Sequence, residues 1–387
     1  MSSPETPVLR AQTEPLHSDQ QTRADERRRQ RRRRTQRSSD ARIVARFTGL
    51  IVALVVLLLA SVTFGVTIGV ASIAPVTVWA IIPEHFGLPV EQTWTQSVEN
   101  IVWVIRLPRV LLGGIVGAGL AVVGVVIQAL VRNALADPYV LGVTSGASVG
   151  ASVVILFGGF GVLGGYAMSG AAFLGALGAV VIVFFVAQRR GRLSPLRLVL
   201  GGVATAYVLS AVTSFLTFQA RDSDAVRAVL FWLLGSLSSA RWSYLTAPIV
   251  VLAVATALMF ARARFLNALV MGDDTAATLG VSAQQVRREM FVVVSLLTGV
   301  LVAVSGGIGF VGLMIPHVVR LIVGPDHRRV LPVAALLGAS FLIWADVGAR
   351  TLFAPEELPI GVITALIGGP VFVLLMRSER YGLRADR

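Results

Sequence analysis

The chain has 387 residues, of which 55% are hydrophobic and 14% are charged, and its formal net charge is +13. An average soluble domain carries about 25% charged residues, so the composition excludes an ordinary water-soluble protein and indicates that most of the chain lies in a lipid bilayer. The sequence contains no cysteine, which excludes disulfides, thiolate metal sites and thiol nucleophiles.

The basic residues are all arginine, because the sequence contains no lysine. A Walker A loop needs a lysine that reaches the nucleotide phosphates. We therefore expect neither an ATPase site nor a bound cofactor in this chain. If it works in an ATP-driven machine, ATP and its Mg²⁺ belong to a separate subunit.

Residues 1–46 are polar and contain twelve arginines, and all but one residue of the run from Arg27 to Arg34 is arginine. Such a segment buries too little apolar surface to offset the entropy lost on ordering it. We predict a disordered cytoplasmic tail that helps to orient the membrane helices and contacts anionic membrane lipid. Nucleic acid is not an expected partner, because neither aromatic residues nor a folded module accompany the charge.

Residues 47–387 are predicted to form one all-α polytopic transmembrane domain, since about 20 apolar residues cross the hydrocarbon core as a helix. A polar segment with tryptophans at 71–100 is expected to be an external loop with an interfacial part. The ten predicted spans are 47–70, 110–131, 139–163, 166–187, 198–220, 243–260, 291–311, a short one at 317–323, 330–345 and 360–376.

The distribution of arginine orients these spans. Outside the tail, the turns on one side hold eleven arginines and the turns on the other side hold six. By the positive-inside rule, both termini are then cytoplasmic. A faint repeat between 120–133 and 301–316 would enter the membrane from opposite sides, as inverted repeats of transporters do.

The longest internal loop, 261–288, carries the signals of a capped helical hairpin. Asp273 and Asp274 stand at a helix start, where carboxylates favour the helix dipole. Gly280 is expected to close that helix, and Ser282 to cap the next one. From the residues alone, this loop is a well-capped surface hairpin.

Three arginines stand at the predicted outer boundary of the membrane: Arg106, Arg109 and Arg350. Arginine near a helix end can bend its guanidinium into the lipid headgroups. Alternatively, a guanidinium can bind a partner's carboxylate through two parallel hydrogen bonds. Both interpretations stay open at this point.

Two ionisable residues, His317 and Asp346, fall deep in apolar surroundings. They could form a proton relay. Alternatively, Asp346 pairs with Arg350 one turn further on, and His317 caps a short helix. The four histidines show none of the spacings of a zinc site, so we expect no metal site. A structural turn is expected at Asn133, Asp137 and Pro138.

Four motifs, in order along the chain, carry a family resemblance: RLPR at 106–109, NALADPYVLGVTSGASVGA at 133–151, GGIGFVGLMIPHVVRLIVGPDHRR at 306–329 and ADVGARTLFAPEELPIGVITALIGGPVF at 345–372. In the third motif, glycines break a helix inside a long apolar run. A membrane tolerates such a break only where protein or a water-filled path covers the freed backbone groups. The chain resembles, over residues 47–377, the permease subunits of ABC importers for vitamin B12 and ferric siderophores (the FecCD type).

The resemblance implies partners. It implies a pore of two permease copies or close paralogues, a separate ATP-binding cassette subunit, and an extracytoplasmic substrate-binding protein whose glutamates dock on Arg106, Arg350 and Arg109. The loop that couples to the ATPase would include Leu266, Gly272, Asp273, Asp274, Leu279, Gly280 and Val281.

It also implies a gate and a cargo. Ser194 and Pro195 align with the cytoplasmic gate, where the family usually has a small polar residue in place of Pro195. The cargo would be a ferric siderophore, with haem and cobalamin as alternatives. The competing function is a proton-coupled secondary transporter that uses Asp346 and His317.

Overall fold

The computed structural model describes residues 42–69, 71–158 and 165–377. The chain separates into two units, Met1–Ala53 and Leu54–Arg387. The described part of the first unit, residues 42–53, is helical. The rest of the predicted tail, residues 1–41, lies outside the described residues, and the first helix begins at Arg42 rather than at 47. All other helices and strands of the described residues belong to the second unit.

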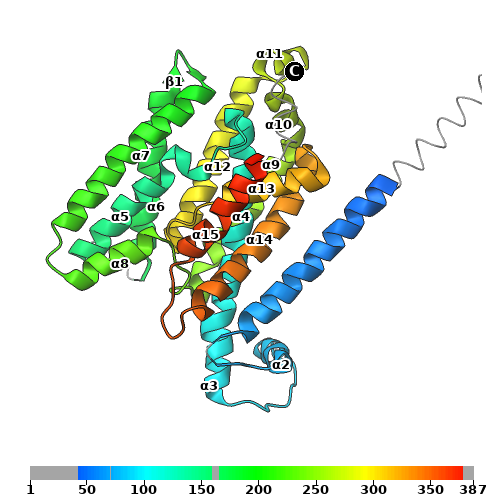
Figure 1. The fold of residues 1–387 in the computed structure, drawn as a ribbon, viewed down its shortest axis with the longest axis vertical. Coiled ribbons are helices and arrows are strands. Elements are labelled where there is room, and N and C mark those ends of the chain that lie inside the picture. Colours follow the sequence, from blue (N-terminus) through cyan, green and yellow to red (C-terminus); the bar gives the residue numbers. More distant parts are fainter. Residues whose placement is uncertain (1–41, 70, 159–164, 378–387) are drawn as a thin grey trace, which may run out of the picture. The chain divides into compact units, whose positions relative to one another are not determined.

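Helices make up almost all of this second unit (Figure 1). In the described part of the chain, seven helical stretches are long and apolar enough to cross a membrane. They are Arg42–Thr67, which begins in the first unit; Gln96–Val131, which joins α3 (Gln96–Glu99), the π-helical η1 (Asn100–Arg106) and α4 (Leu107–Val131); α6 (Ala167–Ala187); α7 (Pro195–Phe218); Trp242–Ala261, which joins η4 (Trp242–Tyr244) to α9 (Thr246–Ala261); α12 (Ala283–Ser305); and α14 (His327–Thr351). Three further apolar helices of the same residues are shorter: α5 (Val143–Phe157), α13 (Val311–Val323) and α15 (Ile360–Arg377). The remaining elements are α2 (Pro75–His85), η2 (Pro138–Leu141), β1 (Gln188–Arg189), β2 (Arg192–Leu193), α8 (Ser223–Leu233), α10 (Ala263–Val270) and α11 (Asp273–Thr278).

The predicted all-α polytopic fold is confirmed, and each predicted span overlaps one apolar helix. The count of ten holds only if the three short helices are included. The second helix begins at Gln96, earlier than predicted, because helical structure continues through the π-helical turn of η1. The third is shorter than predicted because Gly142 and Gly158, both with positive φ, bracket α5.

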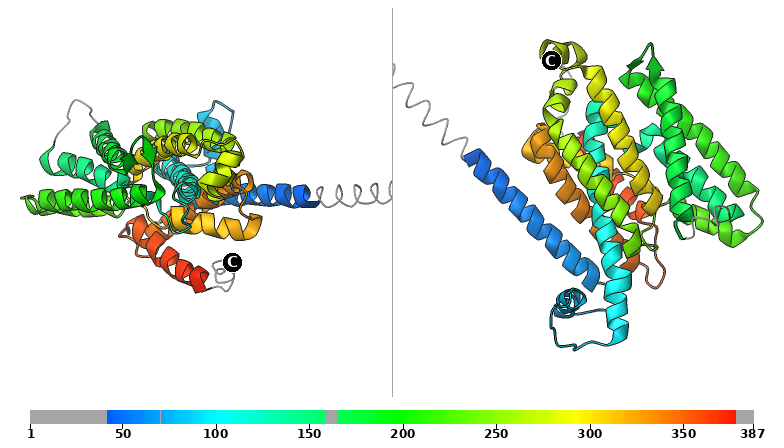
Figure 2. Two further views of the ribbon diagram at one scale, coloured as in Figure 1. Left: turned by 90° about the horizontal axis from the view of Figure 1, so that it is seen from above. Right: turned by 180° about the vertical axis from the view of Figure 1, so that it is seen from behind.

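The centre of the unit is α4, which packs against α9, α12, α13 and α14 (Figures 1 and 2). Close backbone approach depends on glycine here. A Cβ added at Gly124 would overlap the Gly312 carbonyl oxygen, and one added at Gly117 would overlap that of Gly338. Small residues therefore let α13 and α14 contact α4 directly, as expected for membrane helices.

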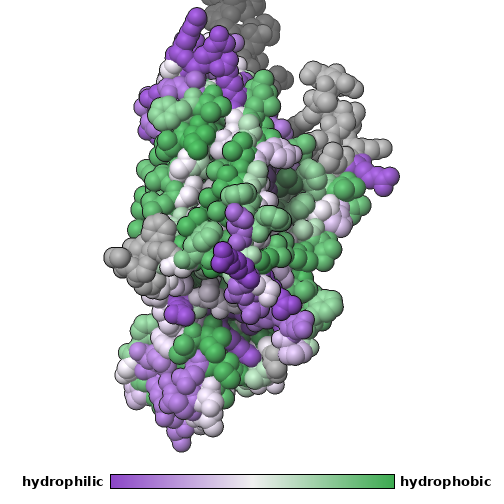
Figure 3. Space-filling view, turned by 90° about the vertical axis from the view of Figure 1, so that its left-hand side faces the viewer, coloured by the Kyte–Doolittle hydropathy of each residue, from purple (hydrophilic) through white to green (hydrophobic). Residues whose placement is uncertain are grey.

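The unit has two polar ends that carry different elements. The hairpin end carries the β1–β2 hairpin, α10 and α11, and the α2 end carries α2 and α3 (Figure 1). Between polar ends, the face in Figure 3 has a broad band of hydrophobic side chains. Large apolar residues such as Leu200, Phe215 and Phe218 on α7 are exposed, which water would not favour. The chain is a multi-pass membrane protein.

The direction of α4 and α12 bears on the predicted repeat. α4 runs toward the hairpin end, and α12 runs away from it (Figures 1 and 2). The segment 120–133 lies in one helix and the turn after it, whereas 301–316 is interrupted between Ser305 and Val311. The opposite directions agree with an inverted arrangement, and the repeat itself stays a prediction.

Candidate functional site

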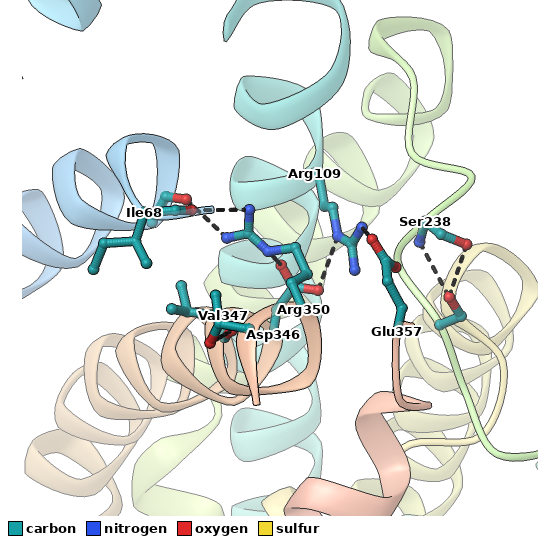
Figure 4. A network of polar contacts seen from close by, with 10 residues as sticks. Ile68, Arg109, Ser238, Asp346, Val347, Arg350 and Glu357 are labelled. Atoms are coloured by element: carbon teal, nitrogen blue, oxygen red, sulfur yellow. Dashed lines mark hydrogen bonds and ion pairs between the residues drawn. The ribbon is translucent and has the colours of Figure 1, made fainter. Parts of the chain in front are cut away.

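At the α2 end, a buried carboxylate joins two arginines from different helices (Figure 4). Asp346 on α14 accepts a hydrogen bond from Arg109 Nε at 3.0 Å, and its other oxygen lies 3.0 Å from Arg350 Nε. Arg109 also donates to Glu357 at 2.9 Å. The side chain of Asp346 is only 2% exposed. Such a carboxylate is stable inside protein only because guanidinium groups neutralise it.

The second part of this network is the end of the first helix. Arg106 donates to the carbonyl oxygens of Val66 and Thr67 at 2.9 and 3.0 Å. Arg350 donates to the Gly65 carbonyl at 2.8 Å. The last carbonyls of a helix have no partner within it, and cations are favoured there by the helix dipole. The two arginines therefore cap this helix end.

The structure thus brings together Arg106, Arg109 and Arg350, which lie far apart in sequence. Together with Asp346 and Glu357 they form the arginine–carboxylate network. The predicted pair of Asp346 and Arg350 is confirmed. All three arginines are less than a tenth exposed and bind protein atoms, which disagrees with the headgroup alternative. Docking of a partner's glutamates on them stays a prediction, and these guanidiniums already have partners within the chain.

At the hairpin end, the caps predicted for the helical hairpin of residues 261–288 are confirmed. Asp273 and Asp274 lie in the first turn of α11, directly after Gly272, whose φ is +116°. Gly280 follows the helix with a φ of +73°. Ser282 accepts a hydrogen bond from Gln285 N at the start of α12. Among the other coupling residues predicted from the resemblance, Leu266 is buried and Leu279 is exposed.

Asp273 does more than favour the helix dipole. Its carboxylate accepts hydrogen bonds from both terminal nitrogens of Arg287, at 2.9 and 3.3 Å. It also forms an ion pair with Arg132 at 3.2 Å. Partial burial raises the pKa of Asp273, but the hydrogen bond and charge of Arg287 and the charge of Arg132 outweigh it and lower the pKa. The acid is therefore ionised at neutral pH.

Arg287 is a residue that the sequence motifs did not single out. Its side chain is fully buried, and it also donates to the backbone carbonyls of Leu130, at the end of α4, and Leu193, on β2. These contacts, with Asp273 and Arg132, make up the Arg287 joint. A signal is present in the sequence: Arg287 lies on the apolar face of α12, with buried residues three and four positions away at Met290 and Phe291. A charge on such a face needs a partner.

The predicted gate lies next to this joint. Ser194 is the N-cap of α7 and Pro195 its first residue, where proline is well tolerated. The preceding residue, Leu193, is buried, and its backbone N–H and C=O both bond to the side chain of Gln284 on α12, at 2.9 and 3.2 Å. The structure therefore connects the predicted gate to the predicted coupling loop, and gating itself stays a prediction.

The helix break between α12 and α13 is enclosed by protein, as expected. The backbone N–H of Ile308 donates to the Tyr139 hydroxyl. Asp137 accepts the backbone N–H of Tyr139 at 2.9 Å and that of Phe310. Burial raises the pKa of Asp137 to about 6, although these two hydrogen bonds oppose the shift. The predicted turn near Asn133 and Asp137 is confirmed, and it covers the broken helix.

His317 and Asp346, the predicted proton relay, differ in surroundings. Asp346 has the two arginine partners described above. His317 is buried in the middle of α13, so it does not cap that helix at its first turn. A relay through these residues stays a prediction.

Comparison with known proteins gives one consistent result. A model of the FecCD transport family matches residues 54–378. The chain is 43% identical over 304 residues to a cobalamin import system permease, BtuC, from Halobacterium salinarum, covering 79% of each chain. It is 41% identical over 293 residues to the hemin transport system permease HmuU of Yersinia pestis, covering 74% of this chain and 87% of that one. A solved inward-facing conformation of a transporter assigned to the metal-chelate ABC type matches with a TM-score of 0.74 and 31% identity, over 85% of this chain and 99% of that one.

Proposed function

Because this chain belongs to the FecCD transport family, whose relatives are permeases of ABC importers, we propose that it carries a ferric siderophore across the cell membrane into the cytoplasm. Two copies, or this chain and a close paralogue, form the pore. A separate ATP-binding cassette subunit hydrolyses ATP, and an extracytoplasmic binding protein delivers the cargo. Both termini and the hairpin end face the cytoplasm.

The Arg287 joint is the observation that carries the proposed mechanism. An ATPase that moves α10 and α11 pulls on Asp273, and Arg287 connects Asp273 to the carbonyls of Leu130 and Leu193. Because Arg287 is fully buried and bonded in several directions, α11, α12, α4 and the β1–β2 hairpin move as one body. The force then reaches Ser194 and Pro195, next to Leu193, where the pore opens or closes.

At the α2 end, a carboxylate of the binding protein would compete with carboxylates of this chain for Arg109. Arg109 already binds Asp346 and Glu357. Asp346 is buried, whereas the side chain of Glu357 is 38% exposed. A carboxylate arriving from the binding protein can therefore replace Glu357 on Arg109 at little desolvation cost, while Asp346 keeps the arginine in position.

The choice of cargo rests on chemistry and on relatives. The relatives of this chain include import permeases named for cobalamin, for hemin and, in Bacillus subtilis, for an iron(3+)-hydroxamate. All three compounds are bulky metal chelates. A ferric siderophore fits this class and is the cargo that we propose.

The test is uptake into proteoliposomes that contain this chain, its ATPase and its binding protein. Labelled ferric siderophore is expected to accumulate only with ATP and binding protein present, and an ATPase variant that cannot hydrolyse ATP is the control. Labelled hemin and cobalamin, measured in parallel, identify the cargo. Uptake driven by a pH gradient without the ATPase, and abolished by Asp346→Asn, would instead establish the proton-coupled transporter.

A further inference from the structure

Three possible metal ligands meet at the α2 end, outside the sites described above. Glu84 and His85 are the last residues of α2, and Glu99 ends α3. Their ligand atoms all lie within 4.8 Å of one another. The histidine spacings in the sequence predict no metal site. This cluster contains a single histidine, and the fold brings its two carboxylates to it, so no histidine spacing in the sequence could indicate it.

The orientation of His85 is the first argument for a ligand. Its Nδ1 lies 3.2 Å from the Ile81 carbonyl oxygen, which can only accept, so Nδ1 carries a proton. Its Nε2 then faces Glu99 Oε1 at 3.5 Å. Two acceptor atoms face each other there unless a cation joins them, either a second proton or a metal ion. Histidines that bind metals usually donate their other N–H to a carbonyl in this way.

Glu84 supplies the second argument. Its Oε1 accepts a hydrogen bond from the Gln92 amide. Its Oε2 is buried and has no hydrogen-bond partner among the described residues. A buried carboxylate oxygen without a partner costs free energy, and a cation in this cluster that Oε2 also coordinates would remove that cost.

We propose that Glu84, His85 and Glu99 bind one divalent transition-metal ion of the Zn²⁺ type. Zinc bonds of about 2.0–2.1 Å in a tetrahedral arrangement separate neighbouring ligand atoms by about 3.4 Å. The 3.5 Å between His85 and Glu99 matches this value. One imidazole nitrogen with two carboxylates suits zinc, leaving a fourth position for water, and it suits Ca²⁺ or Mg²⁺ less, because these ions take six or more oxygen ligands.

The ion would have a structural effect. It would fasten the end of α2 to the start of the long helix Gln96–Val131 and close the loop of residues 86–95 between them. The His85 ring stacks on Trp103, with ring centres 3.9 Å apart. Metal binding at His85 is therefore expected to change tryptophan fluorescence, and this binding does not depend on the transport function proposed above.

The test uses the full chain in lipid nanodiscs, purified without a histidine tag. Zn²⁺ titration by calorimetry is expected to show one ion per chain, and Co²⁺ to give the strong visible absorption of a tetrahedral site. His85→Phe keeps an aromatic ring over Trp103, and Glu99→Gln keeps the shape of the side chain. Each is expected to weaken binding by at least about tenfold.

The matched control is His17→Ala, which removes a histidine outside the described residues and is expected to bind as the unaltered chain does. Melting temperature without metal reports whether each variant is folded. Equal affinity in His85→Phe and the unaltered chain would overturn the proposal, as would titrations with no saturable one-to-one binding. In either case His85 and Glu99 form an ordinary ion pair.

Discussion

At the α2 end an acid, Asp346, is buried between two arginines, whereas at the hairpin end a base, Arg287, is buried and its acid, Asp273, is 38% exposed. If Asp346 is lost, two buried guanidiniums remain without their shared carboxylate. If Arg287 is lost, its partner Asp273 can be hydrated, because it is partly exposed. Loss of the buried group is therefore expected to cost more at the α2 end than at the hairpin end.

The largest expected effect is that of Asp346→Ala. It leaves Arg109 and Arg350 buried without their shared carboxylate, and breaking a buried ion pair in this way costs about 3–5 kcal/mol of the free energy of unfolding. Denaturant unfolding in one detergent measures it. Glu357→Gln, which removes the half-exposed partner of the same Arg109, is the control and is expected to cost no more than about 1 kcal/mol. Equal losses in both variants would show that burial does not distinguish the two carboxylates.

Arg287→Met has the next largest expected effect. Methionine replaces the aliphatic part of the arginine side chain but removes the guanidinium, so the Leu130 and Leu193 carbonyls lose their charged donor. The expected cost is about 2–3 kcal/mol, less than for Asp346, because Asp273 can be hydrated. The amount of cargo moved per ATP is expected to fall as well, since α11 loses its connection to β2.

Arg132→Met provides the comparison for Arg287. Arg132 binds the same Asp273 oxygen, but its side chain is 36% exposed. Its loss is expected to leave both stability and the ratio of transport to ATP hydrolysis nearly unchanged. A normal ratio in Arg287→Met would contradict the proposed path of force.

Asp137→Asn sharpens the comparison, because this buried acid is held by backbone N–H groups rather than by arginine. Its folded pKa of about 6 lies above the ordinary value of 3.8. The folded state therefore binds the proton more tightly than the unfolded state, and stability is lost as pH rises from about 4 to about 6. Asparagine keeps the accepting oxygen without the charge. The variant is expected to be more stable than the unaltered chain at pH 7.5, by about 1–3 kcal/mol, and equally stable at pH 4.

The melting temperatures of both proteins across this pH range provide the measurement. Asp273→Asn is the control of opposite sign. The pKa of Asp273 is lowered in the folded chain by Arg287 and Arg132, in spite of partial burial, so its contribution is present at neutral pH and is lost as pH falls below about 4. A difference between Asp137→Asn and the unaltered chain that does not vary with pH would mean that Asp137 acts through its shape alone.

The features predicted correctly from sequence are local ones. The cap at Ser282, the end of α11 at Gly280 and the pair of Asp346 with Arg350 each involve residues within four positions, whose geometry follows from helical periodicity. The apolar runs likewise predicted where most membrane helices lie, because bilayer thickness sets their length. Boundaries were less accurate where glycine shortened a helix, as at Gly142, or where a π-helical turn extended one, as at Asn100.

The contacts that sequence reasoning missed join distant segments. Arg109 meets Asp346 across 237 positions, and Arg287 meets Leu130 across 157. The sequence of neither segment indicates which residue will be its partner. The packing of the helices determines the partner, for example the close approach of α14 to α4 at Gly117 and Gly338. The same holds for His85 and Glu99, which only the path of the chain between α2 and α3 brings together.

Glu357→Gln, which is expected to change stability only slightly, has the most informative effect on docking. If Glu357 holds Arg109 in place of a partner's carboxylate, its removal frees that side of the guanidinium, and the binding protein is expected to bind severalfold more tightly. If Glu357 serves only to orient Arg109, the arginine becomes less ordered and binding weakens. We expect the first outcome, because the buried hydrogen bond from Arg109 Nε to Asp346 keeps the guanidinium oriented without Glu357. Surface plasmon resonance with the binding protein immobilised measures the change, and Glu356→Gln, at the neighbouring exposed acid, is the control that separates a specific exchange on Arg109 from a general loss of negative charge.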